Sequence, residues 1–277
     1  MVQIITDSST LFTVEEGKNM GIEVLPLCVS IDEAEGRDLQ IDMDDFYGRI
    51  AKGGIPKSSQ PPIGEVMEAF EKYPDAEIIN ISMADGLSGT YQAACGAKEM
   101  VDNKDNITVI NSKTLCGPHR YMVEKAQKMK EAGKTAKEII AWLEKAVESH
   151  ESFLIPQDFD FLRRGGRLTP MAATFASVLH LKPIMIQTKD GCRLDKYGVK
   201  RSFKLAVKSV VEHLKEKELD ARHIIYVSHA RAEEDAKKAV ELLKEHFADV
   251  EIQILELGAA FVTQGGPQCV AIQYIEK

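Results

Sequence analysis

The 277-residue sequence lacks the short motifs that mark the commonest catalytic and cofactor sites. It contains no Gly-x-Gly-x-x-Gly for a dinucleotide, no Walker loop for a nucleoside triphosphate and no His-Glu-x-x-His for zinc. Chemistry performed by this chain alone is therefore not indicated, and we expect neither a cofactor nor a metal.

Paired cysteines are missing as well. The five cysteines are scattered and none forms a Cys-x-x-Cys pair, which predicts buried thiols in a reducing cytoplasm. Cys116 and His119 have the spacing of two metal ligands, but no second pair accompanies them. The beginning of a helix explains this spacing better than a zinc site does.

Long apolar runs and excess positive charge are absent too. No apolar run approaches the roughly 18 residues of a membrane-spanning helix, and no signal peptide opens the sequence. The formal net charge of −8 argues against nucleic acid or an anionic membrane as the main partner. We expect a cytoplasmic protein without stable membrane insertion, in which 44% hydrophobic residues supply a sizeable core.

Strand-like and helix-like segments alternate through the first half of the chain. Thr135 and Glu138 form a capping-box pattern ahead of apolar residues at helical spacing. Alternation of this kind predicts an α/β fold with a mostly parallel, helix-covered sheet. The pattern of amino acids along the chain changes after residue 150. We therefore predict an N-terminal α/β domain over 1–150 and a smaller α/β domain over 151–277.

The stretch 78–91 carries the clearest functional signal. A strand-length apolar run leads into Asp85-Gly86 and then Ser88, ahead of a helical segment. In an open α/β sheet, ligands bind at such a junction, where free N–H groups and the helix dipole favour an anion. Because the turn contains neither Lys nor Arg, we expect a carboxylate rather than a multiply charged phosphate group.

Two further polar clusters occur in the first half. Residues 6–10, at the end of the first strand, are interpreted either as a cap for the helix after Thr13 or as a second polar wall of the same crevice. Ser58 and Ser59 precede a proline-started helix and predict another nest of backbone amides. Capping explains one serine, but it does not explain two such motifs in one half of the chain.

A serine hydrolase is the weaker alternative. Residues 86–90 nearly spell the Gly-x-Ser-x-Gly elbow around Ser88, but Thr90 replaces the last glycine. A triad would need a later acid and histidine. His229 is available, although it lies in no recognisable partner motif.

The second half contains three features of interest. Three arginines around two glycines, at 163–167, form a basic spot that is either a solvated turn or a contact for a partner or phosphate. A predicted helix from Pro170 places apolar residues at helical spacing, which suits a core or one side of an apolar tunnel. The glycine-rich stretch 258–268 predicts a tight turn or a close approach to a ligand.

Six of these motifs occur in the order seen in the DegV family, which the sequence resembles over essentially its whole length. They are Thr6-Asp7-Ser8-Ser9, Ser58-Ser59-Gln60-Pro61, Leu87-Ser88-Gly89-Thr90-Tyr91-Gln92, Leu162-x-x-Gly165-Gly166-Arg167, Lys182-Pro183-Ile184 and the terminal Gly/Pro turn. The resemblance implies a two-domain carrier, not an enzyme, that holds a long-chain fatty acid such as palmitate between its domains. It further implies presentation of that acid to a separate fatty acid kinase for phospholipid synthesis.

The resemblance also assigns site residues by position. The carboxylate would be held by Ser58, Ser59 and Ser88, with Gly89 and Thr90 in the same turn as Ser88. Two arginines, Arg167 and Arg201, would face the partner kinase.

One residue departs from the family pattern. The closing turn usually reads Thr-His-x-Gly-Pro-Gly, whereas this sequence has Gln264 in place of the histidine. Gln264 can form a hydrogen bond with a carboxyl group but carries neither a proton to transfer nor a charge. The alternative is therefore a carrier for another small carboxylate or lipid that is not coupled to a kinase.

Overall fold

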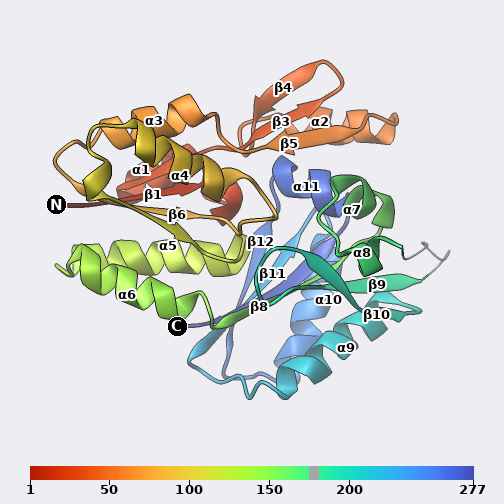
Figure 1. Cartoon of the computed structure of the whole chain (residues 1–277). Coiled ribbons are helices and arrows are strands. Elements are labelled where there is room, and N and C mark those ends of the chain that lie inside the picture. Colours follow the sequence, from red (N-terminus) through yellow and green to blue (C-terminus); the bar gives the residue numbers. More distant parts are fainter. Residues whose placement is uncertain (175–180) are drawn as a thin grey trace. The chain divides into compact units, whose positions relative to one another are not determined.

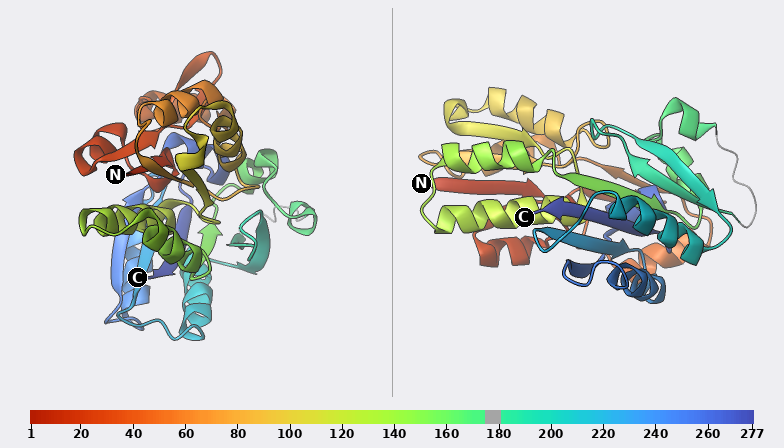
Figure 2. Two further views of the ribbon diagram at one scale, coloured as in Figure 1. Left: turned by 60° about the vertical axis from the view of Figure 1, so that its left-hand side comes forward. Right: turned by 90° about the horizontal axis from the view of Figure 1, so that it is seen from below.

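The computed structural model describes residues 1–174 and 181–277, and the chain forms two compact units, Met1–Glu148 and Ser149–Lys277 (Figure 1). Each unit combines a β-sheet with covering helices, which confirms the predicted mixed α/β fold (Figure 2). Part of the helix predicted after Pro170, including Phe175, Ser177, Val178 and Leu179, lies outside the described residues.

A four-stranded parallel sheet forms the centre of the first unit. Its strands, in spatial order, are β2 (Ile22–Leu25), β1 (Val2–Asp7), β6 (Glu77–Ser82) and β7 (Ile107–Asn111). The two central strands are almost fully buried. Parallel strands that are covered on both faces require continuous apolar runs, which is why the run before Asp85 correctly predicted a strand.

Helices cover both faces of this sheet. Two of them, α3 and α4, pack together on one side, and α5 and α6 pack together on the other (Figure 1). The helices of the unit are α1 (Val14–Met20), α2 (Met43–Ala51), α3 (Ile63–Glu71), α4 (Thr90–Met100), α5 (Cys116–Glu131) and α6 (Ala136–Ala146), with short 3-10 turns η1 (Ser8–Thr10) and η2 (Lys104–Asn106). The predicted capping box of α6 is confirmed, because Thr135 Oγ1 accepts the Glu138 N–H and the Glu138 carboxylate accepts the Thr135 N–H.

The polar cluster at residues 6–10 does not cap the helix that follows it. Thr13 itself caps α1, with Glu16 completing a capping box. Asp7 instead accepts hydrogen bonds from the backbone N–H groups of Ser9 and Met83, each at 2.9 Å. The capping interpretation was therefore wrong, and the cluster joins the end of β1 to the segment that follows β6.

A second, antiparallel sheet in this unit was not predicted. It has the order β4-β3-β5, formed by β3 (Cys28–Ile31), β4 (Ala34–Arg37) and β5 (Pro56–Ser59). The sequence over 22–31 predicts an extended segment with an edge or a bend at Pro26. The chain does leave the parallel sheet there, and it enters this small sheet at Cys28. Ser58 and Ser59 therefore lie on a strand and not in a loop.

The second unit contains a six-stranded sheet with one parallel pair, β11 and β12. Its strands, in spatial order, are β10 (Leu194–Lys200), β9 (Lys182–Gln187), β8 (His150–Ile155), β13 (Val270–Glu276), β11 (His223–His229) and β12 (Glu251–Glu256). The long helices α9 (Phe203–Lys215) and α10 (Glu233–Lys244) share its main apolar core. None of the helices in the described ranges combines the length and apolarity needed to span a membrane.

Within the described residues of the second unit there are also three short helices: α7 (Phe159–Gly165), α8 (Pro170–Ala173) and α11 (Ala259–Gly265). The glycine-rich stretch predicted as a turn contains α11, whose residues from Ala259 to Thr263 are buried. Burial of this short apolar segment outweighs its flanking glycines, and Gly266, with φ of 78°, follows its end. The stretch 163–167 is likewise partly helical, since α7 continues to Gly165.

One buried histidine joins three elements of the first unit. His119, on α5, has no exposed surface, and its Nδ1 lies 2.8 Å from the Ser9 hydroxyl oxygen. Its Nε2 lies 3.0 Å from the carbonyl oxygen of Ile81 and 3.3 Å from the Thr6 hydroxyl oxygen. These bonds account for His119 without a metal ion.

Because His119 is fully buried, we expect the protein to lose stability in acid. Burial, opposed by the negative charge of Asp7 and the hydrogen bond with Ile81, lowers the pKa of His119 below its ordinary value of 6.5. As the pH falls below about 6.5, the unfolded chain takes up a proton here before the folded protein does. This contribution to the free energy of unfolding is complete above that pH and declines by at most about 1.4 kcal/mol per pH unit below it.

Urea unfolding of the wild-type protein and His119→Gln at pH 7.5 and pH 5.5 measures this contribution. We expect the wild-type protein to lose more stability on acidification than the variant, which has no titratable group at this position. Equal losses would show that His119 titrates normally in the folded protein.

Candidate ligand-binding site

The two serine-bearing junctions predicted from the sequence lie next to each other in the first unit. Helices α3 and α4, which follow these junctions, share one apolar core. In front of α3, the Gln60 side chain lies against Gly89, which precedes α4. A Cβ atom at Gly89 would lie only 2.9 Å from Gln60 Oε1, so any larger residue would displace the amide.

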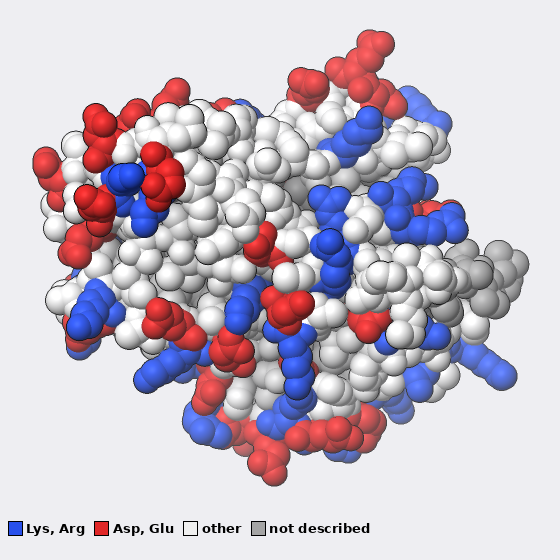
Figure 3. All heavy atoms as spheres, viewed as in Figure 1, with Lys and Arg blue, Asp and Glu red and all other residues white. Residues whose placement is uncertain are grey.

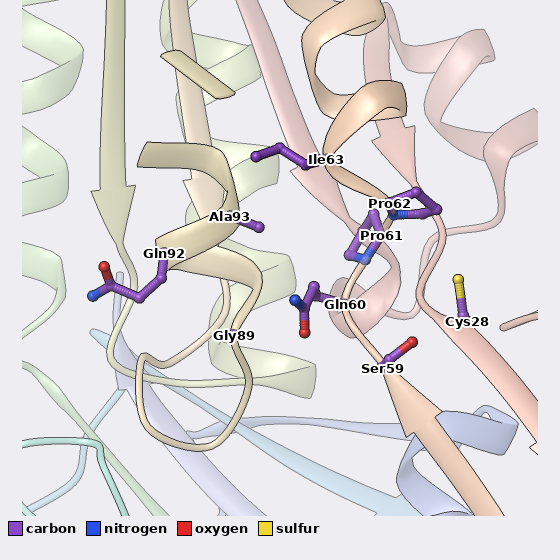
Figure 4. Close-up of a pocket in the computed structure, with 9 residues that line it drawn as sticks. All are labelled: Cys28, Ser59, Gln60, Pro61, Pro62, Ile63, Gly89, Gln92 and Ala93. Atoms are coloured by element: carbon purple, nitrogen blue, oxygen red, sulfur yellow. The ribbon is translucent and has the colours of Figure 1, made fainter. Parts of the chain in front are cut away.

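A hollow opens over this contact, and the Gln60 amide lies between Gly89 and Ser59 (Figure 4). The lining residues are Cys28, Ser59, Gln60, Pro61, Pro62, Ile63, Gly89, Gln92 and Ala93. None of the nine carries a formal charge, and three have side-chain hydrogen-bonding groups of the amide or hydroxyl type. An uncharged, mostly apolar hollow at two helix beginnings suits a single carboxylate better than a phosphate group.

Ser58 and Ser59 point to opposite faces of β5. Directly opposite residues of an antiparallel pair share a face, and successive residues of a strand alternate. Ser59 pairs with half-buried Cys28 and lines the hollow, whereas Ser58 pairs with buried Val29. Neither serine caps α3, which begins after Pro62 without a side-chain cap.

The turn after β6 places Ser88 directly before the first residues of α4. Its hydroxyl oxygen lies 2.8 Å from that of buried Thr90 and accepts the Thr90 N–H at 3.3 Å. Gly89 is the residue that caps α4 and has no side chain for the purpose. When Thr90 donates to Ser88, the Ser88 proton is available for an oxygen of a ligand.

The Asp85 carboxylate stabilises the shape of this turn. It accepts the Gly86 N–H at 3.0 Å and the Gln92 side-chain amide at 2.8 Å. Gly86 has φ of 86°, a conformation that favours glycine. Since Gln92 also lines the hollow, Asp85 links the turn to the first helical residues beside the candidate site.

Sequence reasoning missed Cys28, which lines the hollow, and Arg37, which contacts Cys28. Arg37 Nη1 lies 2.8 Å from Cys28 Sγ, and the other terminal nitrogen of Arg37 forms an ion pair with Glu65 in the first turn of α3. The Glu65 carboxylate therefore balances the guanidinium charge of Arg37. No local signal predicted this arrangement, because it depends on β4, which the sequence did not reveal.

In the second unit, two motifs far apart in the sequence come together. Gln264, on α11, lies over Gly165 at the end of α7, where a Cβ atom would be 2.2 Å from Gln264 Oε1. Arg167 Nη1 donates a hydrogen bond to the Gly165 carbonyl oxygen. The closing turn and the glycine-arginine motif therefore form one local structure.

The two arginines assigned to a partner surface lie at opposite ends of β10. Arg167 contacts the beginning of the strand through Leu194, and Arg201 follows its last residue. A seven-residue strand separates them by about 20 Å. Arg167 is half-buried, and burial together with the charge of Arg193 lowers its pKa, whereas Arg201 is exposed.

The basic spot at 163–167 is formed by the end of α7 and the turn that follows it. Blue atoms gather in Figure 3 where Figure 1 shows α7. Arg163 forms an ion pair with Asp160 at 2.9 Å, and the Arg164 guanidinium lies 4.6 Å from the centre of the Phe161 ring. Both side chains have local contacts and remain exposed.

Comparison with known proteins gives the same fold over the whole chain. The family model described as "Uncharacterised protein, DegV family" matches residues 1–277. Protein DegV of Bacillus subtilis is 30% identical in sequence, with 100% of this chain and 99% of that protein covered. A crystal structure of DegV from Bacillus subtilis, described as a fatty acid binding protein, is 29% identical, covers 100% of this chain and 99% of its own, and has a TM-score of 0.85.

A second solved structure is described with a fatty acid. The DegV family protein of Ruminococcus gnavus, described with vaccenic acid, is 26% identical and has a TM-score of 0.87. The alignment covers 98% of this chain and 99% of that protein. The full-length family match and these relatives show that the chain belongs to the DegV family.

Proposed function

We propose that this protein binds a long-chain fatty acid whose carboxylate lies where the β5–α3 and β6–α4 junctions meet. The observation that carries the proposal is the uncharged hollow beside Ser59, formed where Gln60 meets Gly89. The fatty acids named for solved relatives support this class of ligand.

The carboxylate would be oriented by hydroxyl and amide donors. Ser59 and Ser88 are the proposed hydroxyl donors of the two junctions, and Thr90 supports Ser88 from within α4. We propose Gln264 as a further polar contact. Ser58, which the sequence predicted to hold the carboxylate, lies on the face of β5 opposite Ser59 and is assigned no contact in this hollow. Each hydrogen bond to a charged group contributes about 1.5–3 kcal/mol, so two or three are enough to fix which end of the ligand is held.

The acyl chain would supply most of the affinity. A tail of about fifteen methylene groups, at roughly 0.8 kcal/mol each, contributes on the order of 10 kcal/mol before the cost of association. Polar groups alone cannot match this contribution. We therefore propose that the tail sets the affinity and the serines set the orientation.

We further propose that the protein is a cytoplasmic carrier that presents its ligand to a fatty acid kinase for phospholipid synthesis. Arg167 and Arg201 are the proposed contacts for that kinase. The alternative is a carrier that is not coupled to a kinase, which Gln264 motivates because an amide cannot transfer a proton.

A serine hydrolase has less support. The Ser88 hydroxyl is hydrogen-bonded to Thr90, not to a histidine. The serine-histidine pair of the same unit is Ser9 with His119, and both residues are fully buried, out of reach of a substrate. Ester turnover that disappears in Ser88→Ala would nevertheless establish this activity.

Protein purified under mild conditions is expected to carry a fatty acid of roughly C14–C18, the range of chain lengths that membership of the DegV family suggests. Native mass spectrometry detects the added mass, and extraction identifies the acid. A protein that is free of lipid and does not take up added palmitate would contradict the proposal.

Ser88→Ala is expected to weaken binding of palmitate by about tenfold or more and to leave binding of methyl palmitate nearly unchanged, because the ester lacks the charged acceptor. Thr135→Ala is a matched control, since it removes a cap hydrogen bond from α6 in the same unit. Calorimetry of both ligands measures the difference. Equal losses for acid and ester would restrict Ser88 to a structural role.

Arg201→Glu is expected to slow the formation of acyl phosphate when palmitate-loaded protein is mixed with the cognate kinase and ATP, without changing palmitate affinity. Arg222→Glu, a charge reversal at another exposed arginine of the second unit, is the control. Absence of acyl phosphate with the wild-type protein would favour the uncoupled carrier.

A further inference from the structure

We propose that His119 is a positioning residue for the carboxylate-binding turn, defined here as residues 81–89, which comprise the end of β6 and the turn that follows it. The inference rests on the proposed function, which assigns the carboxylate to this turn. His119 itself is buried on α5 and does not line the hollow.

The hydrogen bonds of His119 determine the position of its proton. The Ile81 carbonyl oxygen can only accept, so Nε2 carries the hydrogen and donates to it at 3.0 Å. The Nδ1 atom then accepts from the Ser9 hydroxyl at 2.8 Å. Thr6 Oγ1 donates to the same Ile81 carbonyl at 2.8 Å, so two side chains hold the first residue of the turn.

The residues after Ile81 are held in the same way. The Met83 N–H donates to Asp7 at 2.9 Å, and the Ala84 N–H donates to the Thr114 carbonyl at 2.9 Å. The Asp85 N–H donates to the side-chain oxygen of Asn111 at 3.2 Å. Hydrogen bonds therefore hold residues 81–85, which lead to Ser88. His119 binds the first residue of this segment.

A neutral imidazole is suited to this position. Asp7 is the charged group whose field reaches the ring, and it opposes the effect of burial, which favours the neutral form. A phenylalanine would fill the space but would remove one donor to Ile81 and the acceptor of the Ser9 hydroxyl. We expect the turn to shift as a consequence. Such a shift weakens a directional hydrogen bond from Ser88 to a carboxylate more than it weakens the burial of an alkyl chain.

The ratio of affinities for palmitate and methyl palmitate tests the proposal. His119→Phe is expected to lower this ratio by about tenfold, the effect of one hydrogen bond to a charged group, while the affinity for the ester changes by less than about threefold. His119→Gln, which restores a donor for Ile81, is expected to recover part of the ratio.

Val123→Ala is the matched control, because Val123 is fully buried one turn further along α5 and takes no part in the hydrogen bonds. It is expected to lower stability and to keep the wild-type ratio. An unchanged ratio in His119→Phe, which results when the acid and the ester lose affinity equally, would overturn the role of His119 but not the proposed carboxylate site. A wild-type protein that binds both ligands equally would overturn the proposed carboxylate site and this inference with it.

If His119→Phe does not fold, the wild-type protein provides the test. Nitrogen-15 NMR is expected to show the Nε2–H tautomer for His119, with signals that shift more on addition of palmitate than of methyl palmitate. A ring protonated on Nδ1, or equal shifts with both ligands, would contradict the proposal.

Discussion

The carboxyl ends of β1 and β6 meet at one edge of the parallel sheet, and buried polar side chains hold them together. Asp7 is central because its two carboxylate oxygens accept one N–H from its own segment and one from the segment after β6. Burying a carboxylate is costly unless it is hydrogen-bonded in this way. The position of the candidate site follows from this edge, since α4 begins where the tethered segment ends.

In the proposed mode of binding, the acyl chain and the carboxylate depend on two different kinds of interaction. Apolar burial is strong but has no direction, whereas hydrogen bonds are directional and contribute less net free energy. The hollow beside Gln60 is uncharged, so it places no counter-charge that would attract phosphate or nucleic acid. The nearby guanidinium of Arg37 is already paired with Glu65, which keeps the hollow neutral.

The sequence predicted the parallel sheet, its principal helices and the DegV family, because buried strands and capped helices leave local patterns. It did not predict β4, whose four residues are mostly polar and acquire their role only by pairing with β3. It also missed α11, since four apolar residues between glycines are too short for a helical period. The contact between Cys28 and Arg37 could not be predicted, because it depends on that unforeseen pairing.

Alternation along β5 makes the chemistry of the hollow depend on strand register. Ser58 and Ser59 are chemically identical neighbours, but they pair with different residues of β3. Ser58 lies opposite Val29, and Ser59 lies opposite Cys28. A slip by one residue that placed Ser58 opposite Cys28 would also place Lys57 opposite Val29, and it would turn every side chain of the strand to the other face. A substitution that shifts the register of β5 by one residue would therefore change the lining of the hollow, although both serine hydroxyls would remain in the chain.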